Sequence, residues 1–293
     1  MPRETLLPGA ESRFSPRRVR SALMFALCGV FAVGIVVILG WVLQYLVRLG
    51  IGGLSLDFFT RVPTGDVSDP GGMKHAIVGT LVLVAIASIV GVPLGMLAGV
   101  YLSEFRSERW LAAPTRFVAD VLAGVPSIVV GILGYELLVV PLGSYNGWAG
   151  ALALAFIMVP IVARTTEEML RLVPQAYREG SLALGATRAQ TITRVVLPAA
   201  TGSIITGIML ALARVAGETA PLLFTALGSR LLTLDPSQPF PSLTVQIYTY
   251  ATGPYESQQE LAWAGILVLV AMLFIINLAI RFIAARAMRK VTG

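Results

Sequence analysis

The stretch "RTTEEMLRLVPQAYREGSLALGATRAQTITRVVLPAATGS", residues 164–203, separates two apolar runs of the chain and decides how the sequence is interpreted. Connections of this length within a compact domain usually have a function. Two residues are typical of helix starts: Pro174 fits the first turn of a helix, and Thr187 fits the N-terminal cap of the next one. Two others are typical of helix ends: Gly185 would stop the first helix, and Pro198 would end the second. These helix start and stop signals therefore predict two short helices in this connection.

The first of these helices carries an apolar surface bordered by charge. Tyr177 and Leu184 are seven residues apart and share one stripe, and Arg178 and Glu179 lie beside them. Helices of this kind dock into grooves on partner proteins. We predict that this segment is a docking element.

The composition indicates an integral membrane protein, because 56% of residues are hydrophobic, only 13% are charged and the mean hydropathy is +0.80. Windows of about 20 apolar residues predict an all-α polytopic protein with six transmembrane helices. The shortest of them contains Pro160. The predicted spans cover residues 21–46, 76–101, 117–140, 149–164, 203–225 and 262–281.

The basic residues are distributed unequally between the two sides of these spans. Of the 22 lysines and arginines, 17 fall in the N-terminal tail, in the loops after the second and fourth spans, or at the C-terminal end. Lysine and arginine near span ends are retained in the cytoplasm. We therefore predict cytoplasmic termini and a cytoplasmic 165–202 loop. This bias also explains the pI of 9.8, so nucleic-acid binding is not expected.

The sequence lacks the motifs of the common hydrolytic sites. A phosphate-binding loop needs a lysine in a glycine-rich context, and the only lysines are Lys74 and Lys290. A zinc protease motif needs two histidines, and His75 is the sole one, expected at the membrane interface. Glu167 and Glu168 are expected on a solvated helix. We predict that the chain is no enzyme and has no catalytic residue, metal site or cofactor of its own.

The segment "EGSLALGATRAQTITRVVLP", residues 179–198, resembles the EAA loop of ABC importer permeases. Glu179 takes the first position, Gly185 the glycine six residues later, and Val195, Leu197 and Pro198 the closing group. Glycine and serine replace the two usual alanines at positions 180 and 181, and valine replaces isoleucine at 195. The resemblance implies a coupling helix that fits a cleft of an ATPase subunit. The predicted coupling residues are Tyr177, Glu179, Gly185, Leu197 and Pro198.

Other segments resemble the PstA-type permeases of phosphate importers, from the second span to the end of the sixth. They are "GVPSIVVGILGY", "LARVAGETAPLLFTA" and "VQIYTYATGP". The resemblance implies the type I ABC importer (MetI-like) fold, the bacterial plasma (inner) membrane and four partner types. These are a PstC-type sister permease, a PstB-type ATPase dimer that uses ATP and Mg²⁺, a PstS-type external phosphate-binding protein, and membrane lipid.

This resemblance divides the chain into four parts. They are a cytoplasmic tail at 1–20, a first transmembrane helix with its outer loop at 21–75, a permease domain at 76–281 that includes the coupling loop 165–202, and a second tail at 282–293. The outer segment 226–260 is proline-rich, and an external binding protein would dock there.

Arg214 and Glu218 are two charges inside an apolar span, a placement that costs about 2.5 to 3.5 kcal/mol for arginine and marks functional candidates. Spaced four apart on one helix, they are predicted to pair. Phosphate would compete with Glu218 for the planar Arg214 guanidinium, whose donors match phosphate oxygens. Alternatively, the pair fastens two helices together or holds the partner permease. Arg164 would be a second cation of the path or an ordinary positive-inside anchor, and Asp120 and Glu136 receive no role.

The predicted function is a transmembrane permease that forms an inorganic phosphate pathway with a sister permease. One alternative is an importer of the same build for another solute, or a transporter subunit without substrate contact. Another is a self-contained secondary transporter or membrane enzyme. A secondary transporter often shows inverted repeats, which the sequence does not show, and an EAA-type loop would have no use in it.

Overall fold

The computed structural model describes residues 16–66, 69–105 and 109–292, and its regular elements within these ranges are helices. Five of them are long and apolar enough to cross a membrane, and a bent pair brings the number to six. The predicted all-helical membrane architecture is confirmed. Most of the predicted tail 1–20 lies outside the described residues, as do Arg106 and Gly293.

The chain divides into two compact units, residues 1–48 and 49–293. The first consists of α1 (Pro16–Gly50), a helix of 35 residues that ends at the start of the second unit. At 1.5 Å per residue such a helix is about 52 Å long, more than the roughly 30 Å of a hydrocarbon core. Its residues 21–47 are uncharged, and arginines flank them. The composition and length of α1 suit a membrane span.

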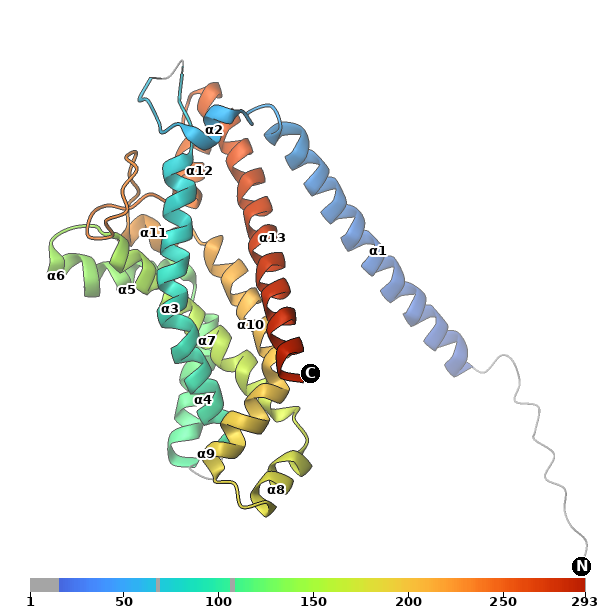
Figure 1. Ribbon diagram of the computed structural model, residues 1–293. Helices are drawn as coiled ribbons and strands as arrows, with labels where there is room; N and C mark the ends of the chain where they lie inside the picture. Colours follow the sequence, from blue (N-terminus) through green and yellow to red (C-terminus); the bar gives the residue numbers. More distant parts are fainter. Residues whose placement is uncertain (1–15, 67–68, 106–108, 293) are drawn as a thin grey trace, which may run out of the picture. The chain divides into compact units, whose positions relative to one another are not determined.

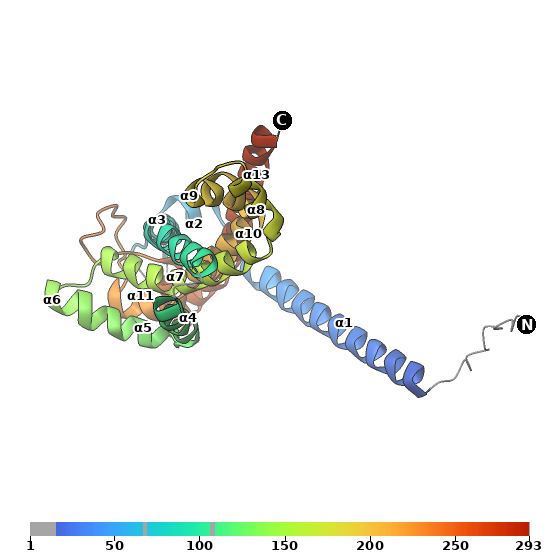
Figure 2. The ribbon, with the colours of Figure 1, turned by 90° about the horizontal axis from the view of Figure 1, so that it is seen from below.

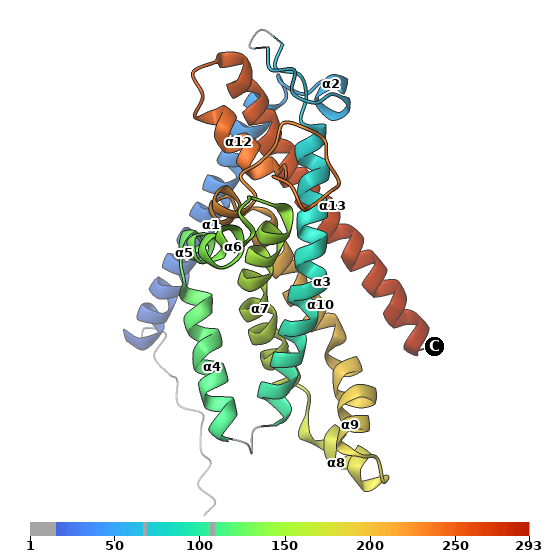
Figure 3. The same cartoon turned by 90° about the vertical axis from the view of Figure 1, so that its left-hand side faces the viewer.

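The centre of the second unit is a close pair of helices, α3 (Lys74–Glu104) and α7 (Gly147–Arg171), which run side by side in Figures 1 and 3. Gly91, Gly95 and Gly99 repeat every four residues on α3 and face α7. A Cβ atom on Gly95 would lie 2.7 Å from Val162 Cβ, so only glycine permits this spacing. Small residues at such a repeat bring two helices into direct backbone contact.

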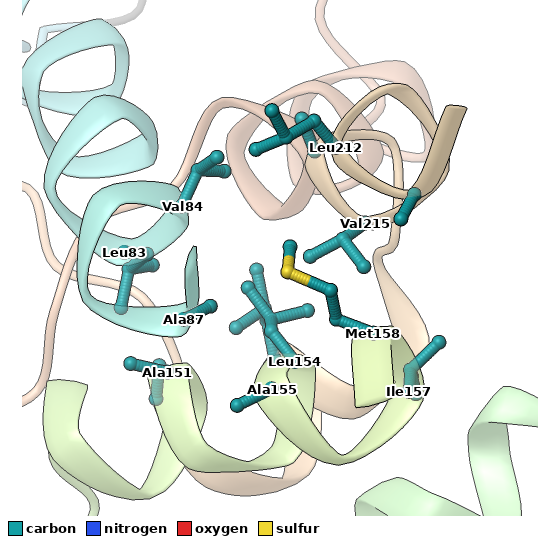
Figure 4. Close-up of a cluster of buried hydrophobic side chains, with 14 of the residues drawn as sticks. Leu83, Val84, Ala87, Ala151, Leu154, Ala155, Ile157, Met158, Leu212 and Val215 are labelled. Carbon is teal, nitrogen blue, oxygen red and sulfur yellow. The ribbon is translucent and has the colours of Figure 1, made fainter. Parts of the chain in front are cut away.

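The apolar core forms where α10 (Leu197–Ala216) joins this pair. Figure 4 shows Leu83 of α3, Leu154 and Met158 of α7, and Leu212 and Val215 of α10 directed toward one another. Helix α13 (Glu256–Thr292) packs against α10 and against the short α12 (Leu243–Ala251), and α2 (Leu56–Thr60) packs against α3. The core therefore joins α3, α7 and α10, which are distant in sequence.

The fourth span was expected to be short, but α7 extends to Arg171 and is the most deeply buried of the candidate spans. Its apolar window is 67% buried and has the lowest mean hydropathy, 1.7. Both properties have one cause: a central helix uses alanine and glycine to admit its neighbours, and these contribute little hydropathy. The helix does not end at residue 164 but continues without a break to Arg171.

The third span was expected to be one helix over 117–140, and the structure breaks it. Helix α4 (Arg109–Gly124) and α5 (Ser127–Gly134) meet at 103°, and η1 (Tyr135–Val139) and α6 (Val140–Leu142) continue α5 (Figure 3). Pro126 favours a break at this place, because the residue before a proline is pushed out of the helical region. Its own ψ is 135°, which is extended.

The fifth span was expected to run as one helix over 203–225, and it too is broken. Helix α10 ends at Ala216, and α11 (Ala220–Thr225) begins after a three-residue gap. Figure 2 shows α11 beside α5. A Cβ on Gly131 of α5 would lie 2.9 Å from Pro221 Cα, so this glycine allows the two short helices to touch.

Pro198 was expected to end a helix, and this expectation is wrong. Residues 188–216 form one continuous helix, which consists of α9 (Arg188–Thr191), the π-helix η2 (Ile192–Val196) and α10. In η2 the amide of Leu197 bonds to Ile192 O, five residues back, immediately before the proline. A π-turn at this place lets the chain pass a residue that lacks an amide donor.

Candidate functional site

Arg214 and Glu218 lie at the break between α10 and α11. The amide of Gly217 donates to Arg214 O at 3.2 Å and that of Glu218 donates to Val215 O at 3.1 Å, so the helix closes with tight turns. Arg214 Nε lies 3.7 Å from Glu218 Oε1, and the two side chains are 52% and 14% exposed. The predicted ion pair is confirmed, but the two residues do not share one helix face, because Gly217 ends the helix between them.

The geometry of this pair is loose. A separation of 3.7 Å is too long for a strong hydrogen bond, and half of the Arg214 side chain is exposed. The Glu218 backbone is held by contrast, since Thr244 of α12 donates its hydroxyl to Glu218 O at 2.9 Å. The backbone that carries Glu218 is therefore anchored, while the half-exposed guanidinium of Arg214 can bind a different anionic partner.

Arg164 belongs to a separate charged cluster between α4 and α7. Its Nε lies 2.9 Å from Glu168 Oε1, and its Nη1 lies 3.6 Å from Glu167 Oε2 and 3.7 Å from Asp120 Oδ1. Asp120, which received no role from the sequence, is thus a partner of Arg164. The ion pairs among the described residues place Arg164 and Arg214 in different clusters.

Glu167 lies in a different environment from the one predicted. It was expected on a solvated helix, but its side chain is only 1% exposed. Arg116 of α4 donates to Glu167 Oε1 through Nε at 3.0 Å and Nη2 at 2.7 Å, and Arg171 contacts the same oxygen. The spacing of Arg164, Glu167 and Arg171 along α7 signals an ion-pair network, but the partner on α4 is 51 residues away.

The predicted coupling segment forms α8 (Gln175–Ala183) and α9, joined by a tight turn. Gly185 has φ +85°, which favours glycine, and Thr187 and Gln190 form a reciprocal capping box. These two local predictions are confirmed. Tyr177 is 59% exposed and Leu184 is 90% exposed, so both apolar side chains are open to a partner.

The other predicted coupling residues occupy different environments. Glu179 and Pro198 are exposed, whereas Leu197 packs partly buried against the cluster of Leu170 and Val196. Arg178 was expected to border the docking surface, and this is wrong. Its side chain is only 14% exposed, because it turns inward to Glu104 at the end of α3.

Comparison with known proteins identifies the family of this chain. Residues 91–289 match the family described as binding-protein-dependent transport system inner membrane component. A Yersinia pestis phosphate transport system permease protein PstA is 44% identical over 246 residues, 84% of this chain and 83% of that protein. The chain belongs to the PstA permease family. A PstA 1 protein of Mycobacterium tuberculosis is 44% identical over 224 residues, 75% of this chain and 72% of that one.

Solved structures show the same fold as this PstA-family chain at low sequence identity. A permease of the inward-facing MetNI methionine ABC transporter superposes with a TM-score of 0.55 at 21% identity, covering 75% of this chain and 98% of that one. A bacterial alginate ABC transporter chain gives 0.63 at 14% identity, covering 94% and 96%. The predicted type I, MetI-like permease fold is confirmed. A PstA-family permease is a multi-pass membrane protein that works with other components of an ABC transporter.

In this PstA-family chain the end of the bundle opposite α8 carries a polar cluster. His75 was expected at an interface, but it is buried, and its Nε2 lies 3.5 Å from Gln246 Oε1 of α12. Burial raises the pKa of the nearby Tyr250 phenol above its usual value, and Arg230 partly opposes this shift. The predicted docking segment 226–260 thus includes a structured helix, α12, that is tied to α3.

Proposed function

We propose that this chain forms the inorganic phosphate pathway of an ATP-driven importer in the bacterial plasma membrane, with both termini in the cytoplasm. Phosphate transport in the names of the PstA relatives supports the cargo. The observation that carries the proposal is a half-exposed guanidinium, Arg214, at a broken transmembrane helix, held only loosely by Glu218.

The exchange of ion partners explains passage without tight binding. A phosphate ion that reaches the break meets a guanidinium whose planar donors fit two phosphate oxygens. Glu218 competes for the same cation, so the ion is held moderately and can leave, as conduction requires. Arg164, which is 44% exposed and lies in a separate cluster of ion pairs, would be a second cation of the path.

The proposed assembly supplies what this chain lacks. A PstC-type sister permease completes the pathway, and a PstS-type binding protein docks on segment 226–260. A PstB-type ATPase dimer, which uses ATP and Mg²⁺, receives the coupling residues. Tyr177, Glu179, Gly185, Leu197 and Pro198 lie on or next to the α8–η2 segment. Movement of this segment would tilt the helices between inward-open and outward-open states.

Labelled phosphate uptake tests the proposal. Cells that lack the gene, with and without the restored chain, are compared at low external phosphate with sulfate and molybdate as competitors. The proposed cargo is supported if the restored chain brings back uptake of labelled phosphate, and if unlabelled phosphate inhibits this uptake while sulfate and molybdate do not. Unchanged phosphate uptake would contradict it, and uptake inhibited by sulfate or molybdate would favour an importer of the same build for that solute.

A further inference from the structure

Helix α8, which carries the proposed docking residues, is attached to the rest of the permease mainly by polar contacts. None of its nine residues, all of which the structure describes, is buried, and Arg178 and Ser181 alone among them are partly buried. A cavity of about 580 Å³ lies between α8 and the ends of α3 and α7. Most helices in proteins are stabilised by packing an apolar face. The position of α8 depends instead on its polar contacts.

Arg178 makes the strongest of these contacts. Its Nη2 lies 2.7 Å from Glu104 Oε1 and its Nε lies 3.2 Å from Glu104 Oε2, a bidentate pair whose side chains are 14% and 9% exposed. The same guanidinium donates to Val173 O at 2.7 Å and to Leu170 O at 2.9 Å. Bidentate pairs fix orientation as well as distance. Arg178 therefore fixes α8 against the last residue of α3.

The neighbouring helix α9 holds the same end of α3. Arg188 donates to the backbone carbonyl of Glu104, and its guanidinium lies 4.3 Å from the centroid of the Phe105 ring. A cation over an aromatic face is attractive. Both short helices of the coupling segment thus contact one point, the C-terminal end of α3.

A displacement at this point would be carried along the permease. A Cβ on Gly99 of α3 would lie 2.6 Å from Ala163 O of α7, and Gly91 and Gly95 are similarly close to α7. Helices in such close contact move together, because packed interfaces do not deform continuously. The chain has a second connection from α8 to α7, the linker 172–174, but that route does not include α3.

We propose that Arg178 and Glu104 are the link that passes a displacement of α8 into α3 during each ATP cycle. This inference rests on the proposed function, in which a partner ATPase moves α8. Arg178 is a positioning residue: it contacts neither phosphate nor ATP, and it keeps α8 and α3 moving as one body. Without it, α8 would reach α3 only indirectly, through the turn to α9 and the contacts of Arg188, and its own direct contact with the end of α3 would be lost.

The first test separates this link from docking. Arg178→Gln and Glu104→Gln are compared with Gln175→Glu, an exposed α8 position that changes the helix charge by the same amount as Arg178→Gln. Each variant is expressed with its transport system, and ATPase co-purification, ATP hydrolysis and phosphate uptake are measured. We expect Arg178→Gln and Glu104→Gln to keep the ATPase bound. The amount of phosphate moved per ATP should fall about tenfold in both, within the usual range of coupling energies. Gln175→Glu should retain wild-type coupling.

A charge exchange distinguishes the pair from its separate residues. Arg178→Glu combined with Glu104→Arg restores opposite charges at the same place, and we expect uptake per ATP above that of either charge reversal alone. Unchanged coupling in Arg178→Gln and Glu104→Gln would overturn the proposal. Loss of the ATPase from these variants would also overturn it, because Arg178 would then act in docking.

A second readout does not depend on the cargo. A Leu97→Cys substitution places a thiol at an exposed position of α3, in a Cys28→Ala background because Cys28 is the only cysteine. The thiol labelling rate is compared without nucleotide and with ATP and vanadate. We expect a nucleotide-dependent change that disappears in Arg178→Gln and persists in Gln175→Glu. If the nucleotide-dependent change persists in Arg178→Gln, or is missing when Arg178 and Glu104 are both present, the proposal is wrong. If phosphate uptake fails while the nucleotide-dependent labelling change is still seen, only the assignment of phosphate as the cargo is contradicted.

Discussion

Two arginine–glutamate pairs of this permease differ in how firmly they are held. Arg178 and Glu104 are 2.7 Å apart, bidentate, and 14% and 9% exposed, whereas Arg214 and Glu218 are 3.7 Å apart and Arg214 is 52% exposed. A guanidinium with its donors committed to one buried carboxylate has a structural role. One that is half exposed and loosely paired can exchange its partner for a passing anion.

The Glu167 cluster belongs to the firmly held class. Its carboxylate is 1% exposed and receives Arg116 from α4 and Arg171 from its own helix. Neutralising this buried carboxylate weakens several charge-assisted hydrogen bonds at once, which costs more than losing one exposed ion pair. The difference between the two classes predicts effects of different size and kind.

The largest effect should come from Glu167→Gln. It replaces a buried carboxylate that accepts charge-assisted hydrogen bonds from Arg116 with a neutral amide, and the expected loss of stability is about 1.5 to 3 kcal/mol. Glu168→Gln is the matched control, since Glu168 is 50% exposed and such pairs are worth up to about 1 kcal/mol. Thermal unfolding in detergent measures both. Equal melting temperatures for the two variants would erase the distinction between the classes.

Arg214→Ala should come next, and it should affect transport without affecting assembly. We expect phosphate uptake to fall by about a hundredfold, the size of loss seen when a preorganised charge-stabilising donor is removed. The partner subunits should still co-purify, because the loose pair contributes little to stability. Arg281→Ala, at an exposed position of α13, is the control. Normal uptake by Arg214→Ala would remove Arg214 from the pathway.

Glu218→Gln should have a smaller effect with a recognisable signature. Without the competing carboxylate, phosphate is held longer at Arg214, so we expect maximal uptake to fall by about tenfold while the apparent KM also falls. Uptake measured over a range of phosphate concentrations separates the two parameters. A raised KM with unchanged maximal uptake would show that Glu218 helps to bind phosphate and does not compete with it.

The smallest effects concern the two glycines of the coupling segment, which should differ in sign. Gly185 has φ +85°, so Gly185→Ala should destabilise the turn by about 1 to 2 kcal/mol. Gly180 lies inside α8, and a Cβ there meets nothing within 4 Å, so Gly180→Ala should stabilise the helix by up to about 1 kcal/mol. Thermal unfolding and ATPase co-purification follow both changes. Equal effects would contradict the assigned turn.

The sequence determined those features that depend on neighbours along the chain. Apolar length set the number of spans, the Glu179–Gly185 spacing indicated the predicted coupling segment, and Thr187 marked a helix start. The pairing of Arg214 with Glu218 was also predictable, because the two residues are four apart and carry opposite charge. Each of these signals lies within one continuous segment of the chain.

Only the tertiary structure decided where the spans break and which charges are buried. Gly217 and Pro126 are permitted in continuous transmembrane helices, so the breaks at these places depend on α5 and α11 packing against each other. Glu167 and Arg178 look solvated on their own helices, and their burial comes from partners 51 and 74 residues away. A periodic pattern specifies one face of a helix. What covers that face is set by the packing of distant segments, because burial is a property of the folded bundle.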